Sequence, residues 1–78
     1  MEVEWERRDA LTLRVDGEVA VFITSASVLA ARDAFELRRQ IIWQLLNRVQ
    51  KKEMTEPVAL DIYKAAVAAP DLPQELQA

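Results

Sequence analysis

Residues 25–53 have the sequence SASVLAARDAFELRRQIIWQLLNRVQKKE, and this stretch decides the fold. Apolar residues recur in it every three or four positions, which is the spacing of a helix with one buried face. Thr24, Ser25 and Ser27 are candidate N-cap residues at its start. The stretch therefore predicts one long helix over residues 27–53.

Three strands are predicted before this helix. Val3 and Trp5 alternate with glutamates in the first strand, so that one of its faces is apolar. The next two strands cover residues 10–14 and 18–23, and they form a hairpin around the only glycine of the chain. Together the three strands predict an antiparallel meander.

Two registers are possible for this hairpin, and they differ in which side chains share a face of the sheet. A two-residue Asp16-Gly17 loop would pair Leu13 with Ala20 and would mix polar and apolar side chains on one face. A three-residue loop with Gly17 at a bulge would instead pair Leu13 with Val19 and keep one face apolar. The sequence therefore favours the three-residue loop.

A second, shorter helix is predicted over residues 56–69. Thr55 is its candidate N-cap, and Pro57 lies in its first turn, where the missing N–H of proline costs nothing. Pro70 ends it, because a proline disfavours helical backbone at the residue before it. The connection to the long helix is therefore short.

Residues 70–78 show no periodicity. They are expected to form an extended or disordered tail unless Leu72 and Leu76 dock on the rest of the chain. Residues 1–69 are expected to form a single domain of the α+β class. Its predicted architecture is a small antiparallel β-meander followed by one long and one shorter α-helix.

The apolar face of the long helix covers about half of its circumference. A face this wide needs neighbours on two sides, whereas a chain of 78 residues can build only a small core. We therefore expect a homodimer formed through the two helices. Its expected interface residues are Arg38, Ile42, Leu45, Val49, Leu60, Tyr63 and Val67.

Arg38 falls near the middle of this apolar face. A buried guanidinium without a partner is costly, so Arg38 requires a carboxylate or backbone carbonyls. We expect it to pair across the dimer interface or with an acid of the second helix.

Trp43 lies outside the apolar face of the long helix. It shares a stripe with basic and polar residues, and a tryptophan beside arginine is typical of protein interfaces. The expected partner-binding residues are Trp43, Arg39, Arg32 and Asn47. In the alternative interpretation, the first strand with its Trp5, or the C-terminal tail, folds over Trp43. Both interpretations predict that Trp43 is covered and not left exposed to solvent.

The composition argues against catalysis and against bound cofactors. The chain has no cysteine and no histidine, so it lacks disulfides, the usual zinc and iron ligands, and a histidine base for a nucleophilic triad. A single glycine does not suffice for a phosphate-binding loop. We expect no catalytic, cofactor-binding or metal-binding residues. No apolar run is long enough to cross a bilayer, and the acidic start does not resemble a secretory signal, so we expect a cytoplasmic protein without membrane contact.

The charge is unevenly distributed along the chain. Residues 19–53 are basic, the segments on either side are acidic, and the net charge is −3. In helical projection Arg32 and Arg39 lie together, but the bases near the end of the long helix point in other directions. No continuous basic stripe results, so nucleic-acid binding stays a minor alternative. The basic helix could also steer an acidic partner protein towards it.

The hairpin around Val15-Asp16-Gly17 runs into the helix beginning near Ser27. This hairpin-to-helix connection resembles the one in small head-completion proteins of tailed phages. That family opens with a helix where this chain opens with a strand. The resemblance implies a structural assembly component as an alternative function. Frequent alanine and arginine suggest a bacterial or phage source. The sequence as a whole favours a small regulator or inhibitor that occupies a surface of another protein.

Overall fold

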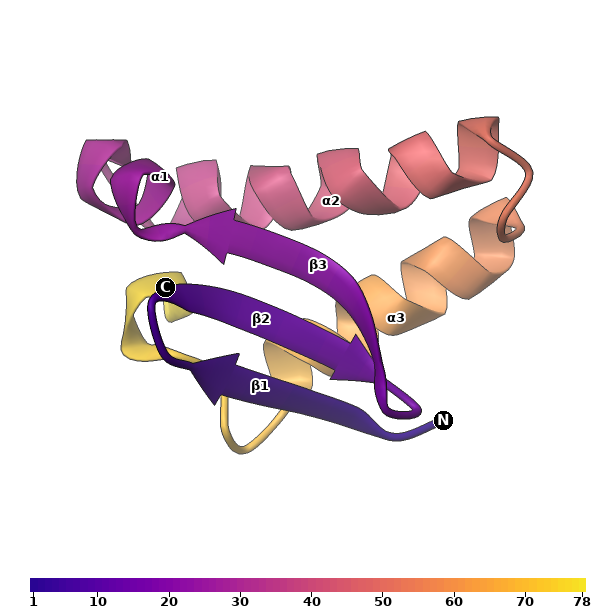
Figure 1. Cartoon of the computed structure of the whole chain (residues 1–78), viewed down its shortest axis with the longest axis horizontal. Helices are drawn as coiled ribbons and strands as arrows, with labels where there is room; N and C mark the ends of the chain where they lie inside the picture. Colours follow the sequence, from indigo (N-terminus) through magenta and orange to yellow (C-terminus); the bar gives the residue numbers. More distant parts are fainter.

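The computed structural model describes residues 1–78 and has an α+β architecture (Figure 1). Three strands form an antiparallel sheet in the order β1-β2-β3. The helices follow the strands, which confirms the predicted meander and the predicted fold class. The elements are β1 (Val3–Arg7), β2 (Ala10–Val15), β3 (Glu18–Thr24), α1 (Ser25–Ala30), α2 (Ala34–Gln50), α3 (Glu56–Ala68) and the 3-10 turn η1 (Gln74–Leu76).

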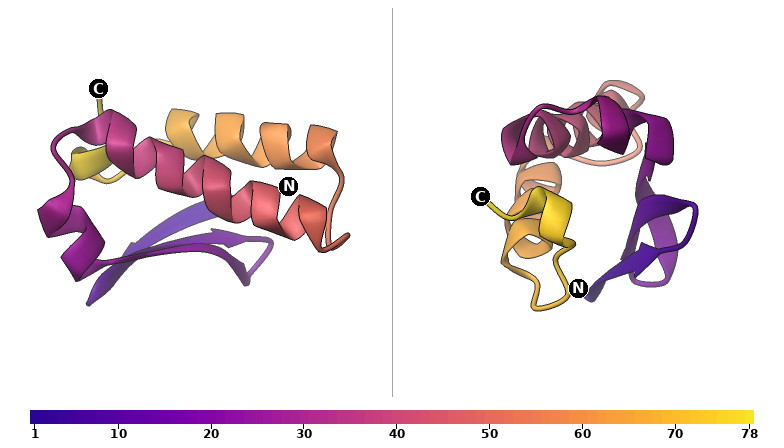
Figure 2. Two further views of the ribbon diagram at one scale, coloured as in Figure 1. Left: turned by 90° about the horizontal axis from the view of Figure 1, so that it is seen from above. Right: turned by 90° about the vertical axis from the view of Figure 1, so that its left-hand side faces the viewer.

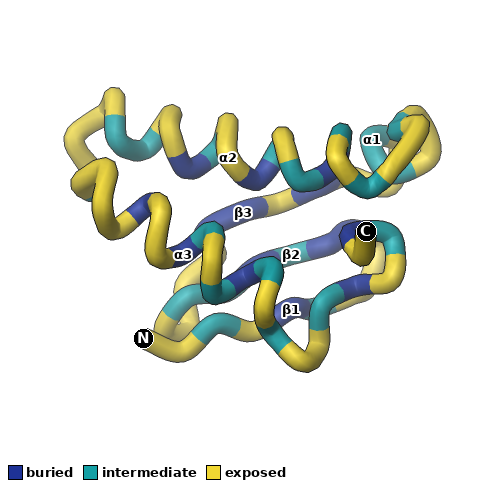
Figure 3. Tube along the Cα trace, turned by 180° about the vertical axis from the view of Figure 1, so that it is seen from behind, coloured by how far each residue is buried: buried dark blue, intermediate teal, exposed yellow.

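The helices α2 and α3 lie on the same side of the sheet and run in nearly opposite directions (Figure 2). The N-terminal half of α2 packs on η1, and its C-terminal half packs on α3. The opposite face of the sheet is uncovered. All burial in this chain is therefore concentrated between one sheet face and the helical layer, as the burial pattern in Figure 3 shows.

The turn between β2 and β3 differs from the prediction. Asp16 and Gly17 have φ values of 51° and 85°, which are typical of the two central residues of a type I′ hairpin loop. Val15 accordingly pairs with Glu18. The predicted three-residue loop is wrong, because Asp16 accepts the left-handed conformation beside the glycine.

A bulge inside the hairpin solves the facing problem that favoured the three-residue loop. Arg14 pairs with Val19, but Leu13 pairs with Val21, so Ala20 is the extra residue. Beyond the bulge the apolar side chains of both strands lie on the same face. The apolar side chains of β3 are therefore brought onto the buried face by a bulge within the β2–β3 pairing and not by a bulge at the turn.

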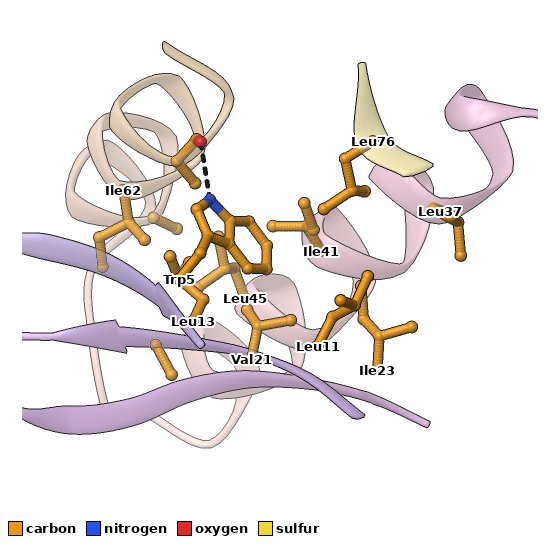
Figure 4. Packing of buried hydrophobic residues seen from close by; sticks show 13 residues of the cluster. Trp5, Leu11, Leu13, Val21, Ile23, Leu37, Ile41, Leu45, Ile62 and Leu76 are labelled. Carbon is orange, nitrogen blue, oxygen red and sulfur yellow. Dashed lines mark hydrogen bonds between the residues drawn. The ribbon is translucent and has the colours of Figure 1, made fainter. Parts of the chain in front are cut away.

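One hydrophobic cluster fills the space between the sheet and the helices (Figure 4). Trp5 of β1 is 7% exposed, and its indole Nε1–H donates to the carbonyl of Ala66 in α3 at 3.0 Å. This bond satisfies the one polar group that the ring brings into the core. The cluster consists of Trp5, Leu11, Leu13, Ala20, Val21, Ile23, Leu37, Ile41, Leu45, Ala59, Ile62, Ala66 and Leu76.

The predicted single long helix is divided into α1 and α2. Ala31 and Asp33 both have extended backbone conformations. The Asp33 carboxylate accepts the backbone N–H of Glu36 at 3.0 Å, and the Glu36 carboxylate accepts the backbone N–H of Arg32 at 2.9 Å. These two hydrogen bonds satisfy backbone N–H groups at the break and start a new helix there.

The second helix closely follows its prediction. It covers Glu56–Ala68, with Thr55 at the N-cap position and Pro57 in the first turn. The side chain of Thr55 makes no capping hydrogen bond. Proline and the residues after it therefore start this helix without help from a capping side chain.

The C-terminal residues dock on the domain, which is the alternative considered for Leu72 and Leu76. Leu76 is fully buried in the core cluster, and Leu72 packs against it. The Asp71 carboxylate accepts the backbone N–H of Trp5 at 3.0 Å. The side chains of Arg7 and Glu75 form an ion pair. The packed unit therefore reaches beyond residue 69 to Leu76.

Side chains from the helical layer bind both outer edges of the sheet. On β3, the amide of Gln44 donates to the Phe22 carbonyl at 2.8 Å and accepts its N–H at 2.9 Å. Arg48 donates to the carbonyl of Val19 at 2.9 Å. Together with Asp71 on β1, these contacts occupy edge groups that would otherwise be open to a further strand. They also fix the position of α2 relative to the sheet.

Replacing Asp33 by Ala should lower the free energy of unfolding by about 1 kcal/mol, because the N-terminus of α2 loses its capping acceptor. Urea unfolding followed by circular dichroism measures this. Thr55→Ala is the matched control, since Thr55 occupies the same position in α3 without a capping bond. Equal losses in the two variants would contradict a capping role for Asp33.

Replacing Trp5 by Phe should lower the free energy of unfolding by about 2 kcal/mol, because the Ala66 carbonyl loses its indole donor, keeping only the longer bond from the Ala69 N–H at 3.4 Å, and the smaller ring leaves a gap. Trp43→Phe makes the same chemical change at an exposed site and should stay within about 0.5 kcal/mol of the wild type. Chemical unfolding monitored by far-ultraviolet circular dichroism compares the two. A loss at position 5 no larger than that at position 43 would refute the importance of this bond.

Candidate protein-binding surfaces

An apolar groove lies between α2 and α3. Its volume is about 520 Å³. We call it the α2–α3 groove. It is lined by Ile42, Leu45, Leu46, Glu56, Pro57, Ala59, Leu60 and Tyr63. Apart from the carboxylate of Glu56 and the hydroxyl of Tyr63, these side chains are apolar.

Helical spacing builds the groove from both sides. Leu45 and Ala59 are buried and form its floor. Ile42 and Leu46 stand one turn apart on α2 and are 38% and 42% exposed, while Leu60 of α3 is 51% exposed. The side chains of α2 next to the groove pack towards the sheet. The chain has no further element to cover the groove, so the groove stays open.

The groove brings together four of the residues predicted for the dimer interface: Ile42, Leu45, Leu60 and Tyr63. Val67 lies one turn beyond Tyr63 on α3 and is half-buried. Val49 is half-buried and packs against the core cluster. Leu46, Pro57 and Glu56 were not among the predicted interface residues. Leu46 belongs to the apolar half of the predicted long helix, and this position could have identified it as an interface residue.

Arg38 is bound within the chain. Its Nε–H donates to the backbone carbonyl of Leu76 at 2.7 Å. A backbone carbonyl is one of the two kinds of partner that a partly buried guanidinium requires. Of the two pairings expected for Arg38, the one with an acid of the second helix is not observed. Arg38 instead fastens the C-terminal segment to α2.

A shallow depression on the outer face of α2 gathers the predicted partner-binding residues. Trp43 is 68% exposed there, with Arg39 and Asn47 one turn before and one turn after it. We call this surface the Trp43 face. It is lined by Glu36, Arg39, Gln40, Trp43, Gln44 and Asn47.

The fourth predicted residue, Arg32, lies outside the depression and is connected to it by Glu36. The Arg32 Nε–H donates to the Glu36 carboxylate at 2.9 Å. The backbone N–H of Arg32 and then its side chain lower the pKa of Glu36, because both hydrogen bonds favour the charged carboxylate. Arg39 forms no ion pair within the chain. Its charge is therefore free beside Trp43.

The chain itself does not cover Trp43, contrary to one of the two interpretations of its position. Trp5 lies in the core, and the C-terminal segment packs against β1 and the N-terminal half of α2. Phe35, which the periodicity placed on the apolar face, is 64% exposed as well. The apolar surface of α2 therefore extends well beyond the groove.

A third, smaller depression lies between the β1–β2 turn, α1 and η1, and it contains the Arg7–Glu75 pair. The side-chain hydrogen bonds from Arg7 lower the pKa of Glu75. The same contact raises the pKa of Arg7. The pair connects β1 to η1 and belongs to the docking of the C-terminal segment.

No three Asp, Glu, His or Cys side chains are grouped in a way that could hold a metal ion. Every buried side-chain nitrogen or oxygen has a hydrogen-bond partner. No helix combines the length and the apolar character needed to cross a bilayer.

The chain matches no protein family model, and no significantly similar curated protein or solved structure was found. Function is therefore inferred from the geometry of the α2–α3 groove and the Trp43 face.

The pH dependence of stability should reveal the Arg7–Glu75 pair. Because the folded-state pKa of Glu75 is lowered, the pair stabilises the fold above the unfolded-state pKa of about 4.3, and this stabilisation is lost as the pH falls through the folded-state value. Glu75→Gln should therefore be less stable than the wild type at neutral pH, and the difference should shrink as the pH falls through the lowered folded-state pKa of Glu75.

Thermal unfolding at a series of pH values measures this difference. Glu18→Gln is the control, because Glu18 is exposed and forms no ion pair. A constant gap between Glu75→Gln and the wild type across the whole range would contradict the assignment. High salt should narrow the gap, since the pair is largely exposed.

Proposed function

We propose that this chain is a non-enzymatic protein-binding module, a small regulator or inhibitor that occupies a surface of another protein through the Trp43 face. The observation that carries the proposal is the exposure of Trp43 beside the unpaired Arg39 on a regular helix. Tryptophan and arginine are enriched among the residues that dominate binding energy at protein interfaces. A large aromatic ring left in water is a source of binding energy that folding has not used.

The Trp43 face is held rigidly, which favours binding. The helix that presents Trp43 is fixed to β3 by the side chains of Gln44 and Arg48. A surface that is already ordered loses little conformational entropy when a partner binds. The helix therefore acts as a preformed ridge.

The free charge of the Trp43 face indicates the chemistry of its partner. Glu36 forms its ion pair with Arg32, whereas Arg39 forms none and acts on Glu36 only through a weaker, longer-range attraction. A partner that offers an apolar pocket for the indole with a carboxylate beside it would match both groups. The proposed partner surface is therefore acidic and apolar.

The bases of α2 support protein binding better than nucleic-acid binding. Arg38 donates to the Leu76 carbonyl, and Arg48 donates to the Val19 carbonyl. Arg32 is paired with Glu36. Few cations remain to follow a phosphate backbone, and they share no continuous stripe. A structural assembly role, the second candidate, would use the α2–α3 groove for contacts between copies.

The test is affinity capture from a lysate of the source cells with quantitative mass spectrometry. A partner should be enriched by the wild type and lost with Trp43→Ala, by about 30-fold if Trp43 contributes about 2 kcal/mol. Leu29→Ala is the matched control, since Leu29 is 86% exposed on α1, away from this face. The captured protein is then purified and titrated against the wild type, Trp43→Ala and Leu29→Ala.

Equal binding by the wild type and Trp43→Ala would overturn the proposal. Partner loss in Leu29→Ala as well would also overturn it, because binding would then follow general hydrophobicity. Circular dichroism of each variant verifies that the fold is retained.

A further inference from the structure

We propose that the α2–α3 groove binds a second copy of this chain in a two-fold symmetric dimer. In this dimer, α2 of each protomer lies in the groove of its partner and the two α2 helices run antiparallel. Three features of the molecule support this occupant: the adjacency of groove and ridge, the charges at the two ends of the groove, and the area left exposed.

The first feature is that the chain carries both halves of the contact side by side. The groove has a buried floor at Leu45 and Ala59. Directly beside it, Ile42 and Leu46 form a half-exposed apolar ridge on α2. An interface around a two-fold axis uses the same patch on both copies, so it needs a ridge and a groove next to each other. Two such pairs of helices would form a four-helix layer with apolar contacts throughout.

The second feature is the charge at the two ends of the groove. Glu56 lines the end near the α2–α3 turn. Arg39, which is free of ion pairs, lies one turn before Ile42 towards the opposite end. With a rise of about 1.5 Å per residue, Arg39 is about 7 Å from the midpoint of the Ile42–Leu46 ridge. A two-fold axis through that midpoint brings Arg39 of each copy towards Glu56 of its partner, so the charges are self-complementary.

The third feature is the surface area. The chain exposes 5357 Å², whereas a folded monomer of 8.9 kDa is expected to expose about 4,800 Å². The shape does not explain the excess, since the radius of gyration of 11.7 Å is close to the value of about 11.5 Å expected for this length. Exposed large apolar side chains, among them Ile42, Leu46 and Leu60 of the groove, contribute to this area. A stable dimer covers about 800 Å² on each partner, which is of the same order as this excess.

The dimer proposal shares Arg39 with the partner-binding proposal but is tested separately from it. It is tested on the purified chain alone, without any other protein. A chain that dimerises but captures nothing through Trp43 would refute only the proposed function. A monomeric chain that binds a partner through Trp43 would refute only the dimer.

Sedimentation of the purified chain from about 1 µM to about 1 mM measures its oligomeric state. The wild type should approach twice its monomer mass of 8.9 kDa as the concentration rises. Leu46→Glu should remain monomeric, because it places a charge in the apolar contact. Leu29→Glu, which makes the same change at the more exposed leucine of α1, should dimerise like the wild type.

Charge reversal tests the antiparallel arrangement itself. Arg39→Glu and Glu56→Arg should each weaken the dimer by about tenfold, because two symmetric contacts become repulsive. The double variant should restore wild-type affinity, since its crossed pairs are attractive again. Circular dichroism verifies the fold of every variant.

Three results would overturn the proposal. The first is a folded wild type that stays monomeric up to the highest concentration. The second is a dimer that Leu46→Glu leaves intact. The third is a double charge reversal that binds no more tightly than the single variants, which would place another surface, or a helix of a different protein, at the groove.

Discussion

The hydrogen bond from the Trp5 indole to the Ala66 carbonyl is the contact on which the rest of the arrangement depends. It joins the first strand to the last helix, and the N–H of the same residue binds Asp71 of the C-terminal segment. Through these two bonds β1 holds both α3 and the docked C-terminus against the sheet. With α3 fixed there, α2 is flanked on one side by β3 and on the other by α3, and the groove between the helices follows from that placement.

A small core explains why binding surfaces remain. The core cluster already contains one side of α2, namely Leu37, Ile41 and Leu45. The adjacent residues Ile42 and Leu46 are equally apolar but stay partly exposed, because the chain supplies only one short helix on that side. Exposed apolar area of this kind is costly in water, and association with another surface relieves that cost. The limited size of the chain is thus the physical link between its fold and a binding function.

Much of the fold could be predicted from local patterns, and the errors have specific physical causes. The break between α1 and α2 was missed because apolar periodicity continues across it, although Asp33 and Glu36 have the spacing of a helix start. The hairpin register was missed because an internal bulge at Ala20 gives the same facing as a bulged turn. For the candidate sites, the stripe around Trp43 could be predicted, because i, i+4 spacing within one helix fixes it. The capture of Arg38 by Leu76 could not, because these residues are far apart in the sequence.

The sequence by itself determined the three strands and the helical region after them, the apolar faces of β1 and β2, the start of α3 at Thr55-Glu56-Pro57 and the apolar side of α2. These properties follow from alternation, helical spacing and backbone preferences, which act over a few residues. Only the tertiary structure decided which part of the apolar side of α2 is covered, that the C-terminal segment docks through Leu76, and that Trp43 is exposed. Periodicity tells which side chains would gain from burial, but their burial depends on how many distant segments the chain can bring to them.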